Sequence, residues 1–174
     1  MNTLEAIAKR VSTRAYTSQP ISEEDIQKIL DAGVAAPAAM AQYEALHITV
    51  VQCKEMILKI LDNMTEVVFQ KTGVREDTYY GERVMIIVSS APPLRPGMEF
   101  VNAGCIIENM VLAATDLGIA SVVLAGAPSA LALNADLQRE LGIPEGRKPL
   151  LAASFGYGAV EEPAKKHTIS INRI

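Results

Sequence analysis

The sequence predicts a single α/β domain, or an α+β domain, in which helices cover a mixed β-sheet. Helical and β-branched apolar segments interleave along residues 1–174, and no internal repeat or low-complexity linker divides them. A length of 174 residues suits one domain with one sizeable core. Hydrophobic residues make up 49% of the chain and aromatic residues only 5%, so we expect a core built mainly from aliphatic side chains.

The front of the chain predicts two helices before any strand. Apolar residues recur at helical spacing over residues 3–11, with Thr3 as the expected N-cap. A polar turn follows. Ser22 then precedes a run of acidic residues, a pattern that caps a second helix and suits its dipole. Gly33 lies near the expected end of this second helix.

Strands and helices alternate in the middle of the chain. The β-branched residues 46–51 predict a strand, and the segment 57–64 has the apolar spacing of a helix. The continuous apolar run 84–88 predicts a strand that is covered on both faces. Residues 100–117 predict the longest helix, which ends at Gly118. Because this helix is apolar on nearly every side, we expect it at the centre of the fold or in a dimer interface.

The last third of the chain predicts two further strands, over residues 119–124 and 150–155. Asn134 is the expected cap of a short helix between them. Residues 168–171 alternate polar and apolar side chains. This tail predicts either an edge strand or an arm that reaches a second subunit.

Charge and composition exclude several classes of partner. The net charge of −4 argues against a nucleic acid or an anionic membrane surface, because both require clustered Lys and Arg. No apolar run approaches the ~20 residues of a membrane span. The first residues carry no basic, apolar leader, so we expect a cytoplasmic protein. Its two cysteines form no Cys-x-x-Cys pattern and are expected to be reduced.

The familiar catalytic motifs are absent from the sequence. It contains no Walker A loop, no His-Glu-x-x-His and no Gly-x-Ser-x-Gly. Its two histidines, His47 and His167, are too few for a histidine-rich metal site, and we predict no metal. No side chain stands out as a catalytic residue. The scarcity of such groups favours a cofactor that carries the chemistry.

The candidate binding motif is the segment Arg10-Val11-Ser12-Thr13-Arg14, which combines two guanidinium groups with two hydroxyl groups after the first helix. Arginine offers planar, bidentate donors to a phosphate, and hydroxyl and backbone N–H groups complete such a site. The alternative is a solvated surface turn, which is common for such residues.

The segment resembles the start of the nitroreductase family, in which the first helix ends in Arg-Arg-Ser-x-Arg, followed by an aromatic residue. Arg10, Ser12 and Arg14 stand at the matching positions, with Tyr16 at the aromatic one. The resemblance covers essentially the whole chain in order. The further matches are Ala36-Pro37-Ala38-Ala39-Met40-Ala41-Gln42-Tyr43, residues 109–118, Ala120-Ser121, Leu124-Ala125-Gly126, residues 141–146, Phe155-Gly156-Tyr157-Gly158, Glu162-Pro163 and Lys165-Lys166.

The resemblance implies a three-layer α-β-α sandwich and a homodimer with FMN at the subunit interface. The phosphate and ribityl chain would lie against the segment 10–14 and two lysines of the tail. The loop 37–41 would lie along the isoalloxazine ring, and backbone N–H groups near Gly126 would face its N5 and O4 edge. The residues implied in cofactor binding are Arg10, Val11, Ser12, Arg14, Pro37, Ala38, Ala39, Met40, Ala41, Ala125, Gly126, Lys165 and Lys166.

The implied activity is an oxidoreductase that takes hydride from NADH or NADPH and reduces nitroaromatic, quinone or similar conjugated acceptors by a ping-pong mechanism. Two alternatives stay open. One is a flavin enzyme of the same fold with another reaction, such as enone reduction or dehalogenation. The other is a non-catalytic dimer that binds a flavin or another small ligand.

The chain departs from the family pattern on the loop that would face the flavin. Ala38 and Ala41 stand where the family usually has Ser and Asn, and Tyr43-Glu44-Ala45 replaces Gln-Pro-Trp. The hydrogen bonds of those side chains to the flavin would be lost or moved to the backbone. We therefore expect a more apolar, open surface over the ring and weaker binding of the cofactor.

Overall fold

The centre of the protein is a four-stranded sheet with the strand order β1-β2-β4-β3. A computed structural model of the chain describes residues 1–75, 78–163 and 167–174. Every pair of neighbouring strands is antiparallel. The strands are β1 (Leu46–Val51), β2 (Val84–Ser90), β3 (Ala120–Leu124) and β4 (Lys148–Gly156).

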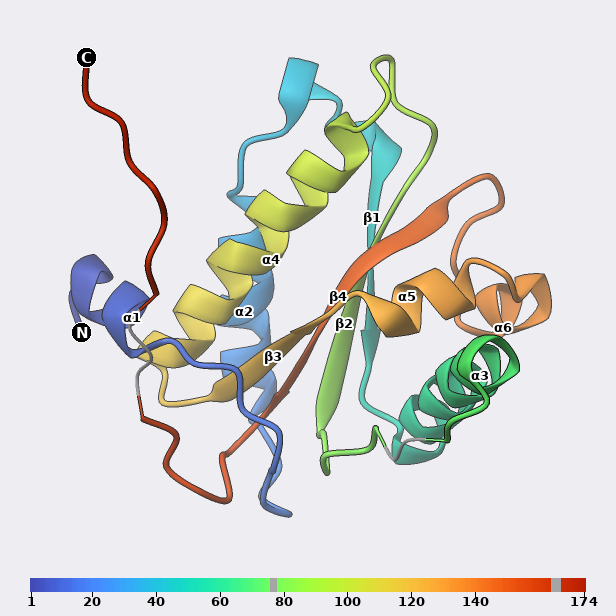
Figure 1. Cartoon of the computed structure of the whole chain (residues 1–174), viewed down its shortest axis with the longest axis horizontal. Helices are drawn as coiled ribbons and strands as arrows, with labels where there is room; N and C mark the ends of the chain where they lie inside the picture. The colour runs from blue at the N-terminus through green and yellow to red at the C-terminus, as the bar shows by residue number, and fades with distance from the viewer. Residues whose placement is uncertain (76–77, 164–166) are drawn as a thin grey trace.

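Helices cover both faces of this sheet (Figure 1). On one face lie α2 (Glu23–Val34) and the long helix α4 (Met98–Asp116). On the other face lie α3 (Lys54–Thr72), α5 (Gly126–Leu131) and α6 (Ala135–Glu140). The short helix α1 (Thr3–Lys9) packs beside the end of α4. The expected α-β-α sandwich is confirmed.

The residues of β2 show why the sheet has two covered faces. All of them are buried, as the continuous apolar run predicts. Successive side chains of a strand point to opposite faces. Val84, Ile86 and Val88 accordingly belong to the core with α2 and α4, while Met85 and Ile87 belong to the core with α3 and α5.

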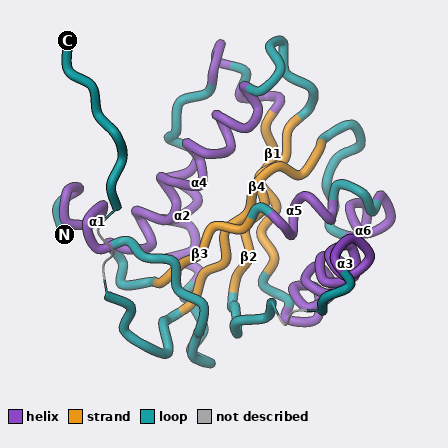
Figure 2. The backbone as a smooth tube through the Cα atoms, in the orientation of Figure 1, coloured by secondary structure: helices purple, strands orange, loops and turns teal. Residues whose placement is uncertain are grey.

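The sheet differs in one respect from the mixed sheet that we expected. The four strands pair only in antiparallel fashion, and the parallel pairing in the described part of the chain is an isolated bridge between Ser12 and Ser121. Figure 2 shows the segment that holds Ser12 as a loop running beside β3. The parallel pairing with the sheet therefore comes from the segment that follows α1.

Two predicted helix boundaries need correction, and one helix was missed. Asn2, not Thr3, caps α1, because the Asn2 side chain accepts the Glu5 N–H while the Glu5 carboxylate accepts the Asn2 N–H. The helix ends at Lys9, since Arg10 takes an extended conformation with ψ of 122°. Helix α5 was not predicted, although its Pro128 lies in the first turn, where proline is tolerated.

The tail does not form the edge strand that was one of its two predicted states. Residues 168–171 have no regular structure and are exposed, and the tail extends away from the body of the fold (Figure 1). Ile169 and Ile171 are 80% and 78% exposed. The other predicted state, an arm that reaches a second subunit, stays a prediction.

Candidate functional site

The segment from Arg10 to Arg14 is held against the edge strand β3. The Thr13 N–H donates to the Ser121 carbonyl at 2.9 Å, and Ser12 forms the parallel bridge with Ser121. Thr13 is buried, whereas Arg14 is exposed. Backbone hydrogen bonding thus fixes the segment in an extended form. Its structure therefore does not depend on the two guanidinium groups.

Tyr16 anchors the other end of the segment. Its N–H donates to the Tyr80 carbonyl at 2.9 Å, and its hydroxyl donates to the Ser154 carbonyl at 3.3 Å. Its ring lies so close to Gly156 that a Cβ at that glycine would approach the ring to 2.8 Å. Burial raises the pKa of Tyr16 above its ordinary value, so the phenol stays a neutral donor. The aromatic residue of the motif is therefore structural.

The buried carboxyl group of Glu82 contacts the backbone of Tyr80, the residue that pairs with Tyr16. One of its oxygens accepts the Tyr80 N–H at 2.9 Å. Its other oxygen and the Ser154 hydroxyl are both buried, and the two groups interact with each other. Burial raises the pKa of Glu82 above its ordinary value. Glu82 is only 1% exposed, so its carboxyl group is not accessible to a ligand bound at the segment.

Both arginines of the segment line a cavity of about 170 Å³. Within the described residues neither forms an ion pair, so both charges are available to an anion. The carboxylate of Glu162 offsets part of this positive charge. The lining residues are Arg10, Val11, Ser12, Arg14, Glu162, Pro163 and His167. Two guanidinium groups and a hydroxyl in one small cavity are the donor set that a phosphate requires.

Ala125 and Gly126 lie further along the same edge of the sheet. They follow the last residue of β3 and begin α5, and both are exposed. From Ser121 to Ala125 the chain advances about 13 Å, at ~3.3 Å per strand residue. A ligand bound at the arginines could thus extend along β3 to the exposed backbone at Gly126.

The loop 37–41 lies elsewhere. The Ala39 N–H donates to the Asn102 side chain near the start of α4, whereas the N-terminus of the chain pairs with Asp116 at the end of α4. Asp116 lies fourteen positions after Asn102 on the helix, a rise of about 21 Å at ~1.5 Å per residue. Figure 1 shows the loop and α1 at opposite ends of α4. Within one chain the segment and Gly126 thus lie along the same edge of the sheet, and the loop lies at the other end of α4 from the segment.

The loop also carries backbone strain. Met40 and Ala41 have φ values of 57° and 55°, the left-handed region that disfavours residues with a Cβ. Each such residue costs about 1–2 kcal/mol relative to a right-handed conformation. The Ala41 N–H donates to the Ala38 carbonyl at 3.0 Å, which closes a tight turn. Strain of this kind collects at ligand clamps and active sites.

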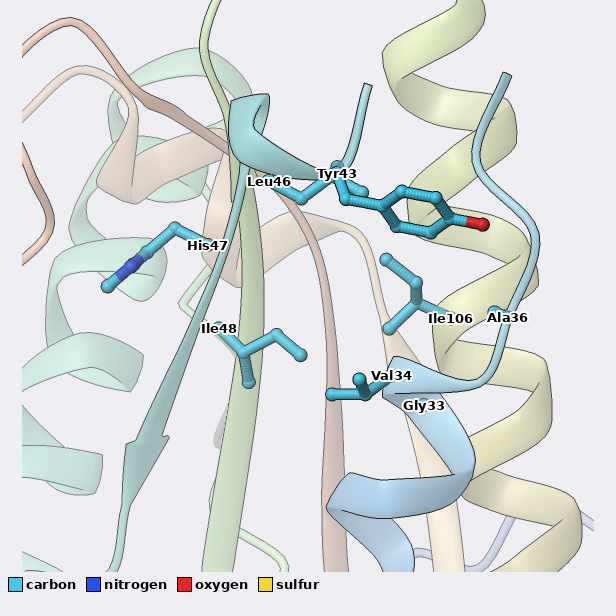
Figure 3. A pocket seen from close by; sticks show the side chains of 8 residues that line it. All are labelled: Gly33, Val34, Ala36, Tyr43, Leu46, His47, Ile48 and Ile106. Atoms are coloured by element: carbon cyan, nitrogen blue, oxygen red, sulfur yellow. The ribbon is translucent and has the colours of Figure 1, made fainter. Parts of the chain in front are cut away.

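A second, apolar cavity of about 280 Å³ lies between the end of α2 and the start of β1. In Figure 3 Tyr43, Val34 and Ile106 gather around the hollow, while His47 points away from it. Burial and the charge of Arg147 lower the pKa of His47. The lining residues are Gly33, Val34, Ala36, Tyr43, Leu46, His47, Ile48 and Ile106. The cavity has few polar groups that could orient a reacting molecule.

Sequence reasoning found some of these residues and missed others. The structure brings Arg10, Ser12 and Arg14 into one cavity, but Lys165 and Lys166 lie outside the described residues. His167 also lines this cavity and was missed, because its place beside the arginines depends on the path of the tail and not on a local pattern. Asn102 was also missed, although an amide within a nearly apolar helix is a usable signal.

No cluster of three or more His, Cys, Asp or Glu side chains able to hold a metal lies among the described residues. Nor do they include a helix of the length and hydropathy that a bilayer crossing requires.

The fold and the site are those of a class of small α+β proteins. This class includes nitroreductases of known structure. A nitroreductase from Bacteroides fragilis with bound FMN is 30% identical, with a TM-score of 0.82 over 100% of this chain and 97% of that one. Another from Desulfitobacterium hafniense, also with bound FMN, is 27% identical, with a TM-score of 0.81 over 99% of this chain and 100% of that one.

Sequence comparison gives the same class. A relative from Archaeoglobus fulgidus, provisionally named NADH dehydrogenase/NAD(P)H nitroreductase, is 33% identical over 162 residues, or 88% of this chain and 84% of the relative. The model of the nitroreductase family matches residues 7–157. The chain belongs to the nitroreductase family.

Proposed function

We propose that the protein is an FMN-dependent oxidoreductase that uses NADH or NADPH as its reductant. The observation that carries the proposal is the cavity lined by Arg10 and Arg14, whose guanidinium groups form no ion pair with any residue that the structure describes. Its donor set fits the phosphate of FMN, and the two solved relatives described above contain that cofactor. The bound flavin would supply the acceptance and return of hydride.

The residues of the chain would bind and orient this cofactor. Arg10, Arg14 and Ser12 would hold the phosphate through charge-assisted hydrogen bonds. The exposed backbone at Ala125 and Gly126 would offer N–H donors to the ring edge, a fixed arrangement that shapes its reactivity. We assign no side chain the role of acid or base in the reaction. No ionisable side chain that lines the two described cavities combines a suitable position with a known hydrogen-bond partner. Lys165 and Lys166 remain proposed contacts by their position in the sequence.

A homodimer would complete the site. The loop 37–41 of one subunit would lie against the flavin held by the arginines of the other, because the loop is at the far end of α4 from its own arginines. The exposed apolar side chains of α4, Phe100 and Val101, support a covering subunit. The tail would serve as an arm on the partner.

The acceptor would be a flat, conjugated molecule such as a nitroaromatic or a quinone, reduced in a ping-pong cycle. The small side chains of Ala38 and Ala41 leave an apolar surface for such a ring. Residues 1–174 would act as one domain in the cytoplasm. Enone reduction and dehalogenation remain alternatives on the same cofactor.

Loading the purified protein with FMN tests the proposal. We expect a yellow protein that retains FMN in equimolar amount with its subunits after gel filtration, identified by releasing the chromophore. A colourless protein that takes up no added FMN would refute the proposal, and a small-ligand-binding dimer would replace it.

A further inference from the structure

The turn formed by Ala39–Ala41 lacks the side-chain cap that such a turn normally has. Its N-cap residue, Ala38, has an extended backbone with φ of −114° and ψ of 133°, and it forms no side-chain hydrogen bond. Serine, threonine, aspartate and asparagine are preferred at this position because their oxygen accepts a backbone N–H of the turn. Alanine offers no such oxygen, and the Ala41 N–H donates instead to the Ala38 carbonyl.

Asn102 supplies an acceptor from another element. Its Oδ1 atom accepts the Ala39 N–H at 2.8 Å, across 63 positions of sequence. Asn102 is 5% exposed, and the other buried residues of α4 are all apolar: Ala103, Ile106, Ile107, Met110, Val111 and Ala114. A buried amide is costly unless it is hydrogen-bonded, so its partner in the loop is the contact that accounts for its presence.

The same hydrogen bond fixes the strained part of the loop. Ala39 immediately precedes Met40 and Ala41, the two residues with positive φ. Beyond the turn, Arg147 donates to the Glu44 and Leu46 carbonyls at 2.8 Å each. The loop is thus held at both ends, and its strained centre is left exposed, with Met40 at 59% exposure.

We propose that Asn102 is a positioning residue for the flavin, which holds the turn Ala39–Ala41 in its binding conformation by accepting the N–H of its first residue. The proposal rests on the FMN site proposed above. It adds to that site a buried side chain that holds the loop in place without touching the cofactor. Removal of the support should release the turn and weaken FMN binding through the loop alone.

The test compares Asn102→Leu, which keeps the size of the side chain and removes the acceptor, with Asn102→Asp, which keeps an acceptor oxygen at the same position. We expect Asn102→Leu to weaken FMN binding by about tenfold or more, and Asn102→Asp to keep the Kd within about threefold of the wild-type value. In the apo protein, hydrogen exchange at the Ala39 amide should be faster in Asn102→Leu.

Asn109→Leu is the matched control. Asn109 lies on the same helix, but its amide donates to the Ala32 carbonyl at 3.0 Å and does not reach the loop. We expect this variant to lose stability without a change in FMN affinity or in exchange at Ala39. Should Asn102→Leu fail to fold, Asn102→Ala takes its place with the same expectations.

The outcomes separate the two proposals. Unchanged FMN affinity and unchanged Ala39 exchange in a folded Asn102 variant would overturn the role of Asn102 and leave the FMN site intact. Equal losses of affinity in Asn102→Leu and Asn109→Leu, or equal losses in Asn102→Leu and a folded Asn102→Asp, would also overturn it. A wild-type protein that binds no FMN would overturn both proposals.

Discussion

The variant Arg10→Ala/Arg14→Ala should fold normally and bind FMN at least a hundredfold more weakly than the wild-type protein. Hydrogen bonds to charged groups contribute about 1.5–3 kcal/mol each. Loss of both arginines therefore removes roughly 3–6 kcal/mol, on the order of 10²–10⁴ in Kd. The fold should survive because backbone pairing with Ser121 holds the segment. Isothermal titration of the apo protein with FMN measures the effect.

A control variant, Arg75→Ala/Arg139→Ala, removes the same charge elsewhere. Arg75 pairs with Glu66 and Arg139 pairs with Asp136, and all four side chains are largely exposed. Such surface pairs contribute little to stability. The control should bind FMN like the wild type. Wild-type affinity in the Arg10/Arg14 variant would refute the assignment of the cavity to the phosphate.

The second large effect concerns a site shared between two subunits. Met40→Pro should abolish FMN binding, since proline requires φ near −65° and Met40 has φ of 57°. We expect the homodimer of this variant and the homodimer of Arg10→Ala/Arg14→Ala each to be colourless. A heterodimer of the two variants, purified with two different tags, would contain one site with intact arginines and an intact loop.

That heterodimer should retain half of the FMN that the wild-type dimer retains. The reason is the length of α4, which keeps each loop from the arginines of its own chain. If both elements served one flavin within a single chain, both sites of the heterodimer would be defective and it would be colourless. A colourless heterodimer, or no heterodimer at all, would contradict the shared site.

Much of the fold could be predicted because its elements follow local rules. The run 84–88 is continuous and apolar, and the structure buries β2 on both faces. Ser22 caps α2 as its sequence context predicts. The start of α1 was wrong by one residue because Asn2 and Thr3 are both plausible caps, and only the pairing with Glu5 decides between them.

The site was harder to predict because it depends on contacts between distant residues. The motif groups Arg10, Ser12 and Arg14, and all three line one cavity, while their role in binding a phosphate stays a prediction. No sequence pattern reveals that Asn102 bonds to Ala39, or that the loop and the arginines lie at opposite ends of α4. The left-handed conformation of Ala41 was equally hidden, since it runs against the preference of alanine.

The most direct test of the central claim is the visible spectrum of the FMN-loaded protein during anaerobic titration with NADH and, separately, NADPH. We predict that at least one of the two removes the oxidised-flavin absorption within seconds, and that a quinone or a nitroaromatic then restores it. A flavin that stays oxidised with both nucleotides in excess would contradict the account and identify the protein as a flavin carrier.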